Sequence, residues 1–157
     1  MSLPERFDLT YVDRDNERRR PIMIHRTVFG SIERFLGILI EHFAGKFPLW
    51  MSPVQVILLP INDDLIPHAT AVRKVFDDSG LRTELDNRTE SLNKKVREAQ
   101  LQKIPLIVTI GEKEKAARTL SVRTLDGAVH YGVSQETFID KVLEHIKNRA
   151  ISLELFT

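Results

Sequence analysis

The chain has 157 residues and a mass of 18.1 kDa, which is the size of one domain with at most a short extra lobe. Its 42% hydrophobic and 29% charged residues are typical of a soluble globular protein and exclude a disordered or collagen-like one. The 23 basic and 22 acidic residues leave a net charge of +1, which argues against nucleic-acid binding through bulk charge, although residues 82–123 are locally basic. The sequence has no cysteine, which excludes disulfides and zinc sites built on thiolates. It has no secretory signal, and no apolar run approaches the length of a membrane helix, which is about 20 residues, so we expect a cytoplasmic protein without a membrane partner.

The first part of the chain predicts a strand hairpin followed by one helix. Phe7–Asp13 and Pro21–Thr27 have the composition of strands, and the polar segment between them would form a charged turn. From Ser31 to Phe43, apolar residues recur at spacings of three and four, which predicts an amphipathic helix that ends at Gly45. Two strands and one helix cannot bury this apolar stripe by themselves.

Strands and helices alternate in the rest of the sequence, after a short segment with two prolines. The order is βαβαβ and then ββα, which predicts an α/β fold. We expect a mixed sheet of about five strands flanked by three helices, preceded by the hairpin and its helix. The expected strands are Val54–Pro60, Arg82–Asp86, Pro105–Gly111, Leu120–Thr124 and Val129–Val133, and the apolar faces of the expected helices run through Leu65–Phe76, Leu92–Ala99 and Phe138–Ile146.

No short catalytic motif is present in this α/β unit. The glycine-rich phosphate loops, the HExxH zinc motif and the GxSxG nucleophile motif are all missing from the sequence. The five histidines show no metal-ligand spacing. His25 follows a predicted strand and could point into a pocket, but the residues alone favour an ordinary histidine.

Two long segments carry a resemblance to a known family. The first is RRRPIMIHRTVFGSIERFLGILIEHFAGKFPLWMSPVQV (Arg18–Val56), which is similar to the third class-defining motif of bacterial threonyl-tRNA synthetases and the start of their anticodon-binding domain. The second is DNRTESLNKKVREAQLQKIPLIVTIGEKE (Asp86–Glu114), which resembles that domain. The strings MIHR, GSIERF and KKVREAQ are together highly specific, and the resemblance extends over Pro4–Arg149.

The resemblance implies that the chain is a C-terminal fragment of a larger enzyme. Its segments would be a remnant of the class II catalytic domain (1–47), a linker (48–53), a class II anticodon-binding domain (54–150) and a tail (151–157). The fragment would recognise the anticodon stem-loop of threonine tRNA, while the parent enzyme, expected to be a homodimer, joins threonine to that tRNA with ATP. Because the first two class II motifs do not occur in the sequence, we expect no threonine activation by this chain alone.

The resemblance also assigns roles within the catalytic remnant. Arg34 matches the arginine that contacts the ATP phosphates, and Ser31 and Gly30 match positions that line the adenylate pocket. His25 matches one of three zinc ligands, of which the other two belong to sequence upstream. A single imidazole cannot form a zinc site, so we expect no cofactor on the fragment, whereas the parent would use ATP with magnesium and one zinc ion.

RNA-binding roles follow from the same resemblance. Glu114 matches a carboxylate that accepts hydrogen bonds from a guanine of the anticodon, and Arg123 matches an arginine that donates to bases or phosphates. Thr89 stands where the family more often has an asparagine that helps to read the anticodon, which puts that contact in doubt. The residues expected to position the RNA backbone are Arg88, Lys94, Lys95 and Arg97.

One alternative function and one question of assembly stay open from the sequence. The alternative is a freestanding relative that uses this fold for protein association or regulation, but such a module would have no use for Arg34 and His25. The apolar helix at residues 31–43 could fold back on the anticodon-binding domain or pair with a second copy, and we favour self-association.

Overall fold

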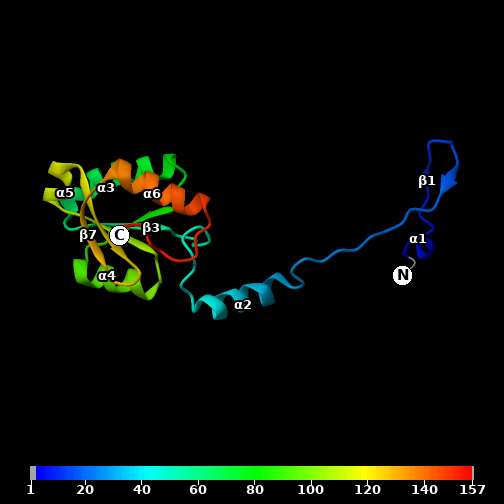
Figure 1. Cartoon of the computed structure of the whole chain (residues 1–157), viewed down its shortest axis with the longest axis horizontal. Coiled ribbons are helices and arrows are strands. Elements are labelled where there is room, and N and C mark those ends of the chain that lie inside the picture. Colours follow the sequence, from blue (N-terminus) through cyan, green and yellow to red (C-terminus); the bar gives the residue numbers. More distant parts are fainter. Residues whose placement is uncertain (1–2, 157) are drawn as a thin grey trace. The chain divides into compact units, whose positions relative to one another are not determined.

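The computed structural model describes residues 3–156, so the ends of the segments expected at 1–47 and 151–157 lie outside the described residues. The chain forms two compact units, Met1–Ile38 and Leu39–Thr157, and helix α2 (Ile32–Phe43) runs from one into the other (Figure 1). Within the described residues, no helix is long and apolar enough to cross a membrane.

The first unit has little regular structure before α2. It contains α1 (Leu3–Arg6) and a two-stranded antiparallel ladder of β1 (Tyr11–Val12) and β2 (Arg18–Arg19). A hairpin forms, but it is not the expected one. Strand β1 lies within Phe7–Asp13 as predicted, whereas its partner β2 lies in the segment expected to be the turn, so the strand predicted at Pro21–Thr27 is wrong. Pro21 has no N–H to donate, and Ile22 and Ile24 are 91% and 87% exposed, so no packed surface favours a strand there.

Helix α2 forms where the apolar periodicity predicts it. Ser31 caps its start, because the Ser31 hydroxyl accepts a hydrogen bond from the N–H of Arg34 at 3.4 Å. None of the helix residues is buried in the chain, and Ile32, Leu36 and Ile40 are 64%, 49% and 54% exposed. Part of the apolar stripe that the sequence predicts is thus exposed, whereas Phe35, Leu39 and Phe43 are half-buried.

The second unit contains the expected mixed sheet, with strand order β4-β3-β5-β6-β7. Strands β4, β3 and β5 are parallel, and β6 and β7 are antiparallel to their neighbours. The strands are β3 (Val56–Pro60), β4 (Thr83–Leu85), β5 (Leu106–Ile110), β6 (Thr119–Thr124) and β7 (Val129–Ser134). The long helices are α3 (Ile66–Asp78), α4 (Leu92–Leu101) and α6 (Gln135–Lys147). Two short helices are the 3-10 turn η1 (Asp63–Leu65) and α5 (Glu112–Ala117). The fold class predicted from the sequence is confirmed, and η1 and α5 are additions to it.

The two faces of the sheet are covered unequally. Helices α3 and α6 pack on one face, where Phe76 stacks on Phe138 inside the main core (Figure 1). Helix α4 covers the other face only over β3 and β5, where Ala99 packs against Ile57 and Ile107. The part of this face that belongs to β6 and β7 is less covered. Arg123 and Val129 are half-buried there and Tyr131 is exposed, whereas Ser121 is buried.

The residues after α6 pack against the rest of the second unit. The Nε2 atom of buried His145 lies 2.7 Å from the carbonyl oxygen of Ser152. Leu155 is 6% exposed, and the ring of Phe156 stacks on Phe138. Within the segment expected as a tail, Leu153, Leu155 and Phe156 therefore pack in the main core, whereas Ile151 is 74% exposed.

Candidate nucleic-acid interface

A cavity of about 260 Å³ opens on the less covered part of the sheet. We call it the Glu114–Arg123 cavity. Strands β5, β6 and β7 form its floor, and α4 and α5 form its sides. Its lining consists of Ile61, Leu92, Asn93, Val96, Thr109, Glu114, Ser121, Arg123, Val129 and Tyr131.

Strand register explains why polar side chains meet on this floor. Thr109 of β5 lies opposite Ser121 of β6, and Arg123 of β6 lies opposite Val129 of β7. Residues directly opposite in antiparallel strands point to the same face, and so do residues two apart on one strand. These four side chains therefore share the face that α4 leaves open.

Glu114 is held at the cavity by the first turn of α5. Its Oε2 atom accepts a hydrogen bond from the N–H of Gly111 at 3.1 Å, which caps the helix. A Cβ added at Gly111 would lie 2.7 Å from this oxygen and 2.8 Å from Cδ1 of Ile61, so a larger residue there would displace the ends of both side chains. The carboxylate is half-buried and keeps its second oxygen available as an acceptor.

Arg123 reaches the same cavity from β6. One guanidinium nitrogen, Nη1, donates to the carbonyl oxygen of Gly127 at 3.3 Å, which fixes the side chain beside the β6–β7 turn. A guanidinium has five N–H donors, so four remain for other partners. The structure thus places one acceptor and one cation in a single half-buried site.

Two further lining residues were missed by sequence reasoning. Asn93 stands in the first turn of α4, and Tyr131 stands in β7 with 78% of its surface exposed. The register of β6 and β7 shifts between Leu120 and Val122, opposite Tyr131 and Gly132. A lone glycine within a strand pattern is the sequence signal of such a bulge, and it could have directed attention to Tyr131.

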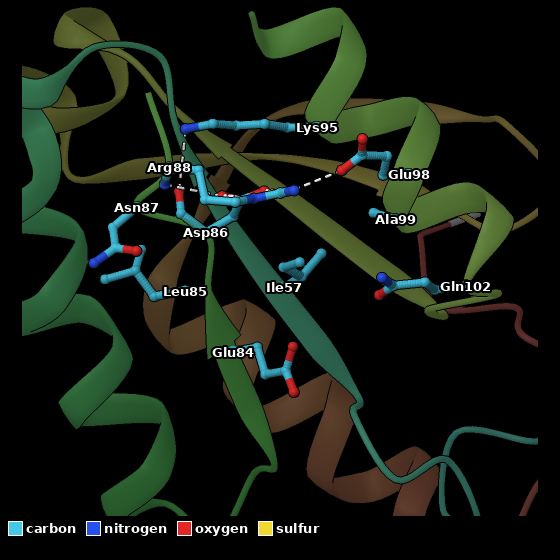
Figure 2. A pocket seen from close by; sticks show the side chains of 10 residues that line it. All are labelled: Ile57, Glu84, Leu85, Asp86, Asn87, Arg88, Lys95, Glu98, Ala99 and Gln102. Carbon is cyan, nitrogen blue, oxygen red and sulfur yellow. Dashed lines mark hydrogen bonds and ion pairs between the residues drawn. The ribbon is translucent and has the colours of Figure 1, made fainter. Parts of the chain in front are cut away.

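A second cavity, of about 310 Å³, lies on the other side of α4 and holds a network of charges (Figure 2). We call this network the Asp86–Arg88 cluster. Arg88 grips the Asp86 carboxylate with two nitrogens, at 3.0 and 2.6 Å, and donates to Glu98 at 2.7 Å. Lys95 is only 4% exposed, and its Nζ donates to the backbone oxygen of Asp86 at 3.2 Å.

This network shifts the protonation equilibria of its members. The hydrogen bond from Arg88 lowers the pKa of Asp86 below its ordinary value, against the opposing effect of burial. The bonds to Asp86 and Glu98 in turn raise the pKa of Arg88. Outside the network, on the solvent side of α4, Lys94 pairs with Glu90 at 2.5 Å and lowers the pKa of that carboxyl.

Comparison with known families identifies this unit. The family described as "Anticodon binding domain" matches residues 55–145, which is more than half of the chain. The chain belongs to the anticodon-binding domain family. The family described as "tRNA synthetase class II core domain (G, H, P, S and T)" matches residues 1–43, in front of the anticodon-binding domain.

Curated relatives are threonine–tRNA ligases. The chain is 67% identical over 149 residues to the ligase of Desulfosudis oleivorans, covering 95% of this chain and 23% of the relative. It is 50% identical over 149 residues to the ligase of Clostridioides difficile, again covering 95% of the chain and 23% of the relative. The predicted resemblance to threonyl-tRNA synthetases is confirmed, and the chain spans about a quarter of the length of these relatives.

A solved structure supports the same assignment. The crystal structure of the RNA binding domain of threonyl-tRNA synthetase from Cryptosporidium parvum Iowa II matches with a TM-score of 0.69 and 31% identity. The match covers 92% of this chain and 37% of the other. The five-stranded sheet is therefore the fold of an anticodon-binding domain of the threonyl-tRNA synthetase type.

The residues that we predicted from the sequence to contact RNA lie at different places in the folded domain. Glu114 and Arg123 share one cavity, whereas Arg88 and Lys95 belong to the Asp86–Arg88 cluster. Thr89 lies exposed in the turn before α4 and lines neither cavity. Among the remaining predicted contacts, Lys94 and Arg97 are exposed on the surface of α4.

The residues assigned to ATP and zinc lie in the segment that matches the class II core. Gly30 has φ of +66°, Ser31 caps α2, and the side chains of Arg34 and His25 are exposed. The hydroxyl of Ser31 also donates to Glu33 at 2.6 Å, which lowers the pKa of that carboxyl. The described residues contain no group of three His, Cys, Asp or Glu side chains that could hold a metal ion, so they do not fit a zinc site by themselves.

Proposed function

We propose that this chain recognises the anticodon loop of a threonine tRNA through the Glu114–Arg123 cavity. The observation that carries the proposal is the meeting of Glu114 and Arg123 in one half-buried cavity of an anticodon-binding domain. Similarity to threonine–tRNA ligases supports threonine tRNA as the RNA. The sheet floor and two helices would hold an unpaired base apart from its neighbours in the loop.

The chemistry of the cavity suits guanine. A carboxylate can accept hydrogen bonds from both N1–H and N2–H of guanine, whereas adenine, cytosine and uracil lack this pair of adjacent donors. Glu114 would be this acceptor, and Arg123 would donate to a base oxygen or to the neighbouring phosphate. Cavity burial strengthens both interactions, because water competes less for the same groups.

Residues of α4 would add to this recognition. Asn93 lines the cavity and brings an amide, which can donate and accept at once, whereas Thr89 lies outside it. Lys94 and Arg97 lie exposed on the same helix and would contact backbone phosphates. Lys95 does not contact RNA in this proposal, because its ammonium group is buried in the Asp86–Arg88 cluster.

The proposal places the chain in the C-terminal part of a threonine–tRNA ligase of the cytoplasm. In that enzyme Arg34 would contact ATP phosphates beside Ser31 and Gly30, and His25 would supply one zinc ligand together with ligands from other segments. A bound zinc ion would hold the amino and hydroxyl groups of threonine. This chain alone is expected to show no threonine-dependent exchange of ATP and pyrophosphate.

The direct test compares two anticodon stem-loops that differ only in the anticodon guanine. The unmodified chain should bind the guanine loop more tightly than the adenine loop by about 1–3 kcal/mol, roughly five- to hundredfold, because adenine leaves the Glu114 carboxylate without donors. Fluorescence anisotropy with labelled loops at fixed salt measures both affinities. Equal binding of the two loops would contradict the readout of guanine by Glu114, and binding of neither loop would favour a protein-association module.

A matched pair of variants assigns the effect to Glu114. Glu114→Gln keeps an oxygen that can cap α5 but loses the second acceptor, so it should reduce the preference for guanine. Glu112→Gln removes the same charge from an exposed position on the same helix and does not touch the cavity. The control variant should keep the full preference, and loss of the preference in both variants would indicate a general charge effect.

A further inference from the structure

The feature that carries a further inference is the exposed ring of Tyr131 at the Glu114–Arg123 cavity. Tyr131 is 78% exposed, whereas Phe76 and Phe138 of the main core are fully buried. Among the described residues of the second unit, no other aromatic side chain is exposed to a comparable degree. An aromatic ring held on a folded strand and left open to water is typical of a binding surface.

A β-bulge directs this ring. Val122 pairs with His130 and Leu120 pairs with Val133, so Tyr131 and Gly132 together oppose one residue of β6. Gly132 has φ of +71°, a conformation that other residues rarely adopt. Such a bulge increases the local twist of its strand and redirects the side chains beside it. The conformation of Gly132 thus determines where the ring of Tyr131 points.

The ring lies beside groups that can bind the edge of a planar ligand. Tyr131 lines the same cavity as Glu114 and Arg123. Unpaired RNA bases are bound in this way, with an aromatic side chain against the face and polar groups against the edge. The cavity has Ile61 and Val129 as further apolar lining, which favours a flat aromatic guest over a hydrated phosphate.

We infer that Tyr131 is the stacking surface for one unpaired base of the bound RNA, at or next to the base whose edge Glu114 binds. The inference rests on the proposed function, since it needs RNA in this cavity. Stacking does not depend on base identity, because every base has a π face. Tyr131 would therefore contribute affinity, while Glu114 contributes the choice of base.

The test uses the full chain with the guanine and adenine stem-loops. Tyr131→Ala should weaken binding of both loops about five- to hundredfold, and Tyr131→Phe should keep nearly full affinity because it keeps the ring. The ratio between the loops should stay as in the unmodified chain, since Glu114 is unchanged. Leu101→Ala, which shortens another exposed apolar side chain at the end of α4, is the matched control and should have no effect.

A fluorescent base identifies the stacked position. When 2-aminopurine replaces each loop nucleotide in turn, one position should be quenched by the unmodified chain and by Tyr131→Phe, but not by Tyr131→Ala. Gly132→Ala should reduce the quenching as well. A Cβ at this position meets no atom within 4 Å, so the substitution acts through backbone conformation alone.

The outcomes separate the two proposals. Unchanged affinity of Tyr131→Ala, with the guanine preference intact, would overturn the stacking role and leave the proposed function standing. Equal binding of both loops by the unmodified chain, with affinity still lost in Tyr131→Ala, would overturn the role of Glu114 and keep the stacking surface. Binding of neither loop by the unmodified chain would overturn both.

Discussion

At the scale of single residues, charge type alone does not reveal the role of a side chain in this domain. Arg88, Lys94 and Lys95 lie close together in the sequence, and all three were expected to contact RNA. In the structure Lys95 is buried, Arg88 is bound to two carboxylates, and Lys94 is exposed with one ion pair. The burial of an ammonium group depends on a partner from another segment, here the backbone of Asp86, which periodicity cannot reveal.

Asp86 gives a prediction about stability and pH. Its pKa is lowered in the folded chain by the hydrogen bond from Arg88, so the ionised form stabilises the fold. This contribution is present above the ordinary pKa of about 4 and is lost as the pH falls through the lower pKa of the folded state. Asp86→Asn should therefore destabilise the chain by about 1–2 kcal/mol at pH 7 and by less near pH 3.

Urea unfolding followed by circular dichroism at the two pH values measures this difference. Asp77→Asn is the matched control, because Asp77 pairs with Arg73 on the exposed face of α3. Its effect should stay within about 0.5 kcal/mol at both pH values, as for most exposed ion pairs. An equal loss of stability for Asp86→Asn at pH 7 and pH 3 would mean that its charge has no part in the effect.

At the scale of elements, α4 has two roles because different sides of it face different cavities. Leu92, Asn93 and Val96 border the Glu114–Arg123 cavity, while Lys95 and Glu98 border the Asp86–Arg88 cluster. The turn before α4 is fixed by the grip of Arg88 on Asp86 and Glu98 (Figure 2). The cluster therefore positions the helix whose other side borders the proposed base site.

The two neighbouring lysines of α4 should separate stability from RNA binding. Lys95→Met leaves the backbone oxygen of Asp86 without its donor and should lower the free energy of unfolding by about 1–3 kcal/mol. Lys94→Met should leave the free energy of unfolding nearly unchanged, because its pair with Glu90 is exposed. Lys94→Met should instead reduce the slope of binding affinity against salt concentration by about one phosphate contact. Urea unfolding and titrations at several salt concentrations measure both effects. If Lys95→Met reduced the salt dependence of binding and Lys94→Met lowered the free energy of unfolding, Lys95 would belong to the RNA-binding surface.

Elements with a strong periodic pattern could be predicted, and those defined by their neighbours could not. Strand β3 is a continuous apolar run buried on both faces, and β5 is apolar and buried except at Thr109, so their position follows from composition. Helix α5 has six residues without an apolar stripe, and its capping glycine gives no side-chain signal. Glu114 and Arg123 were found through family resemblance, whereas Tyr131 depends on a bulge whose register only the folded sheet defines.

At the scale of the whole molecule, the chain joins a class II core segment to an anticodon-binding domain, as the two family matches show. These parts differ in how far they bury their own apolar residues. The second unit has two core clusters and a full sheet, while α2 has no buried residue. A helix with one strongly apolar side is not stable in water by itself and gains stability from packing.

The exposed side of α2 predicts self-association of the full chain. Ile32, Leu36 and Ile40 lie four residues apart on one side of the helix, and about half or more of each is exposed. Pairing of two copies through this side would remove the apolar surface from water, so the sedimentation coefficient should rise with protein concentration. Leu36→Glu combined with Ile40→Glu should abolish the rise, because two close copies would then bury carboxylates.

The control for this experiment is Glu41→Gln, which changes the exposed polar side of the same helix and should leave the association unchanged. Stem-loop binding should also be unchanged in the double variant, since the Glu114–Arg123 cavity contains no residue of α2. A monomer at all concentrations, with α2 protected from hydrogen exchange, would contradict pairing and would show that the chain covers this helix itself. A monomer with rapid exchange throughout α2 would also contradict pairing, and it would mean that the helix needs a partner other than a second copy.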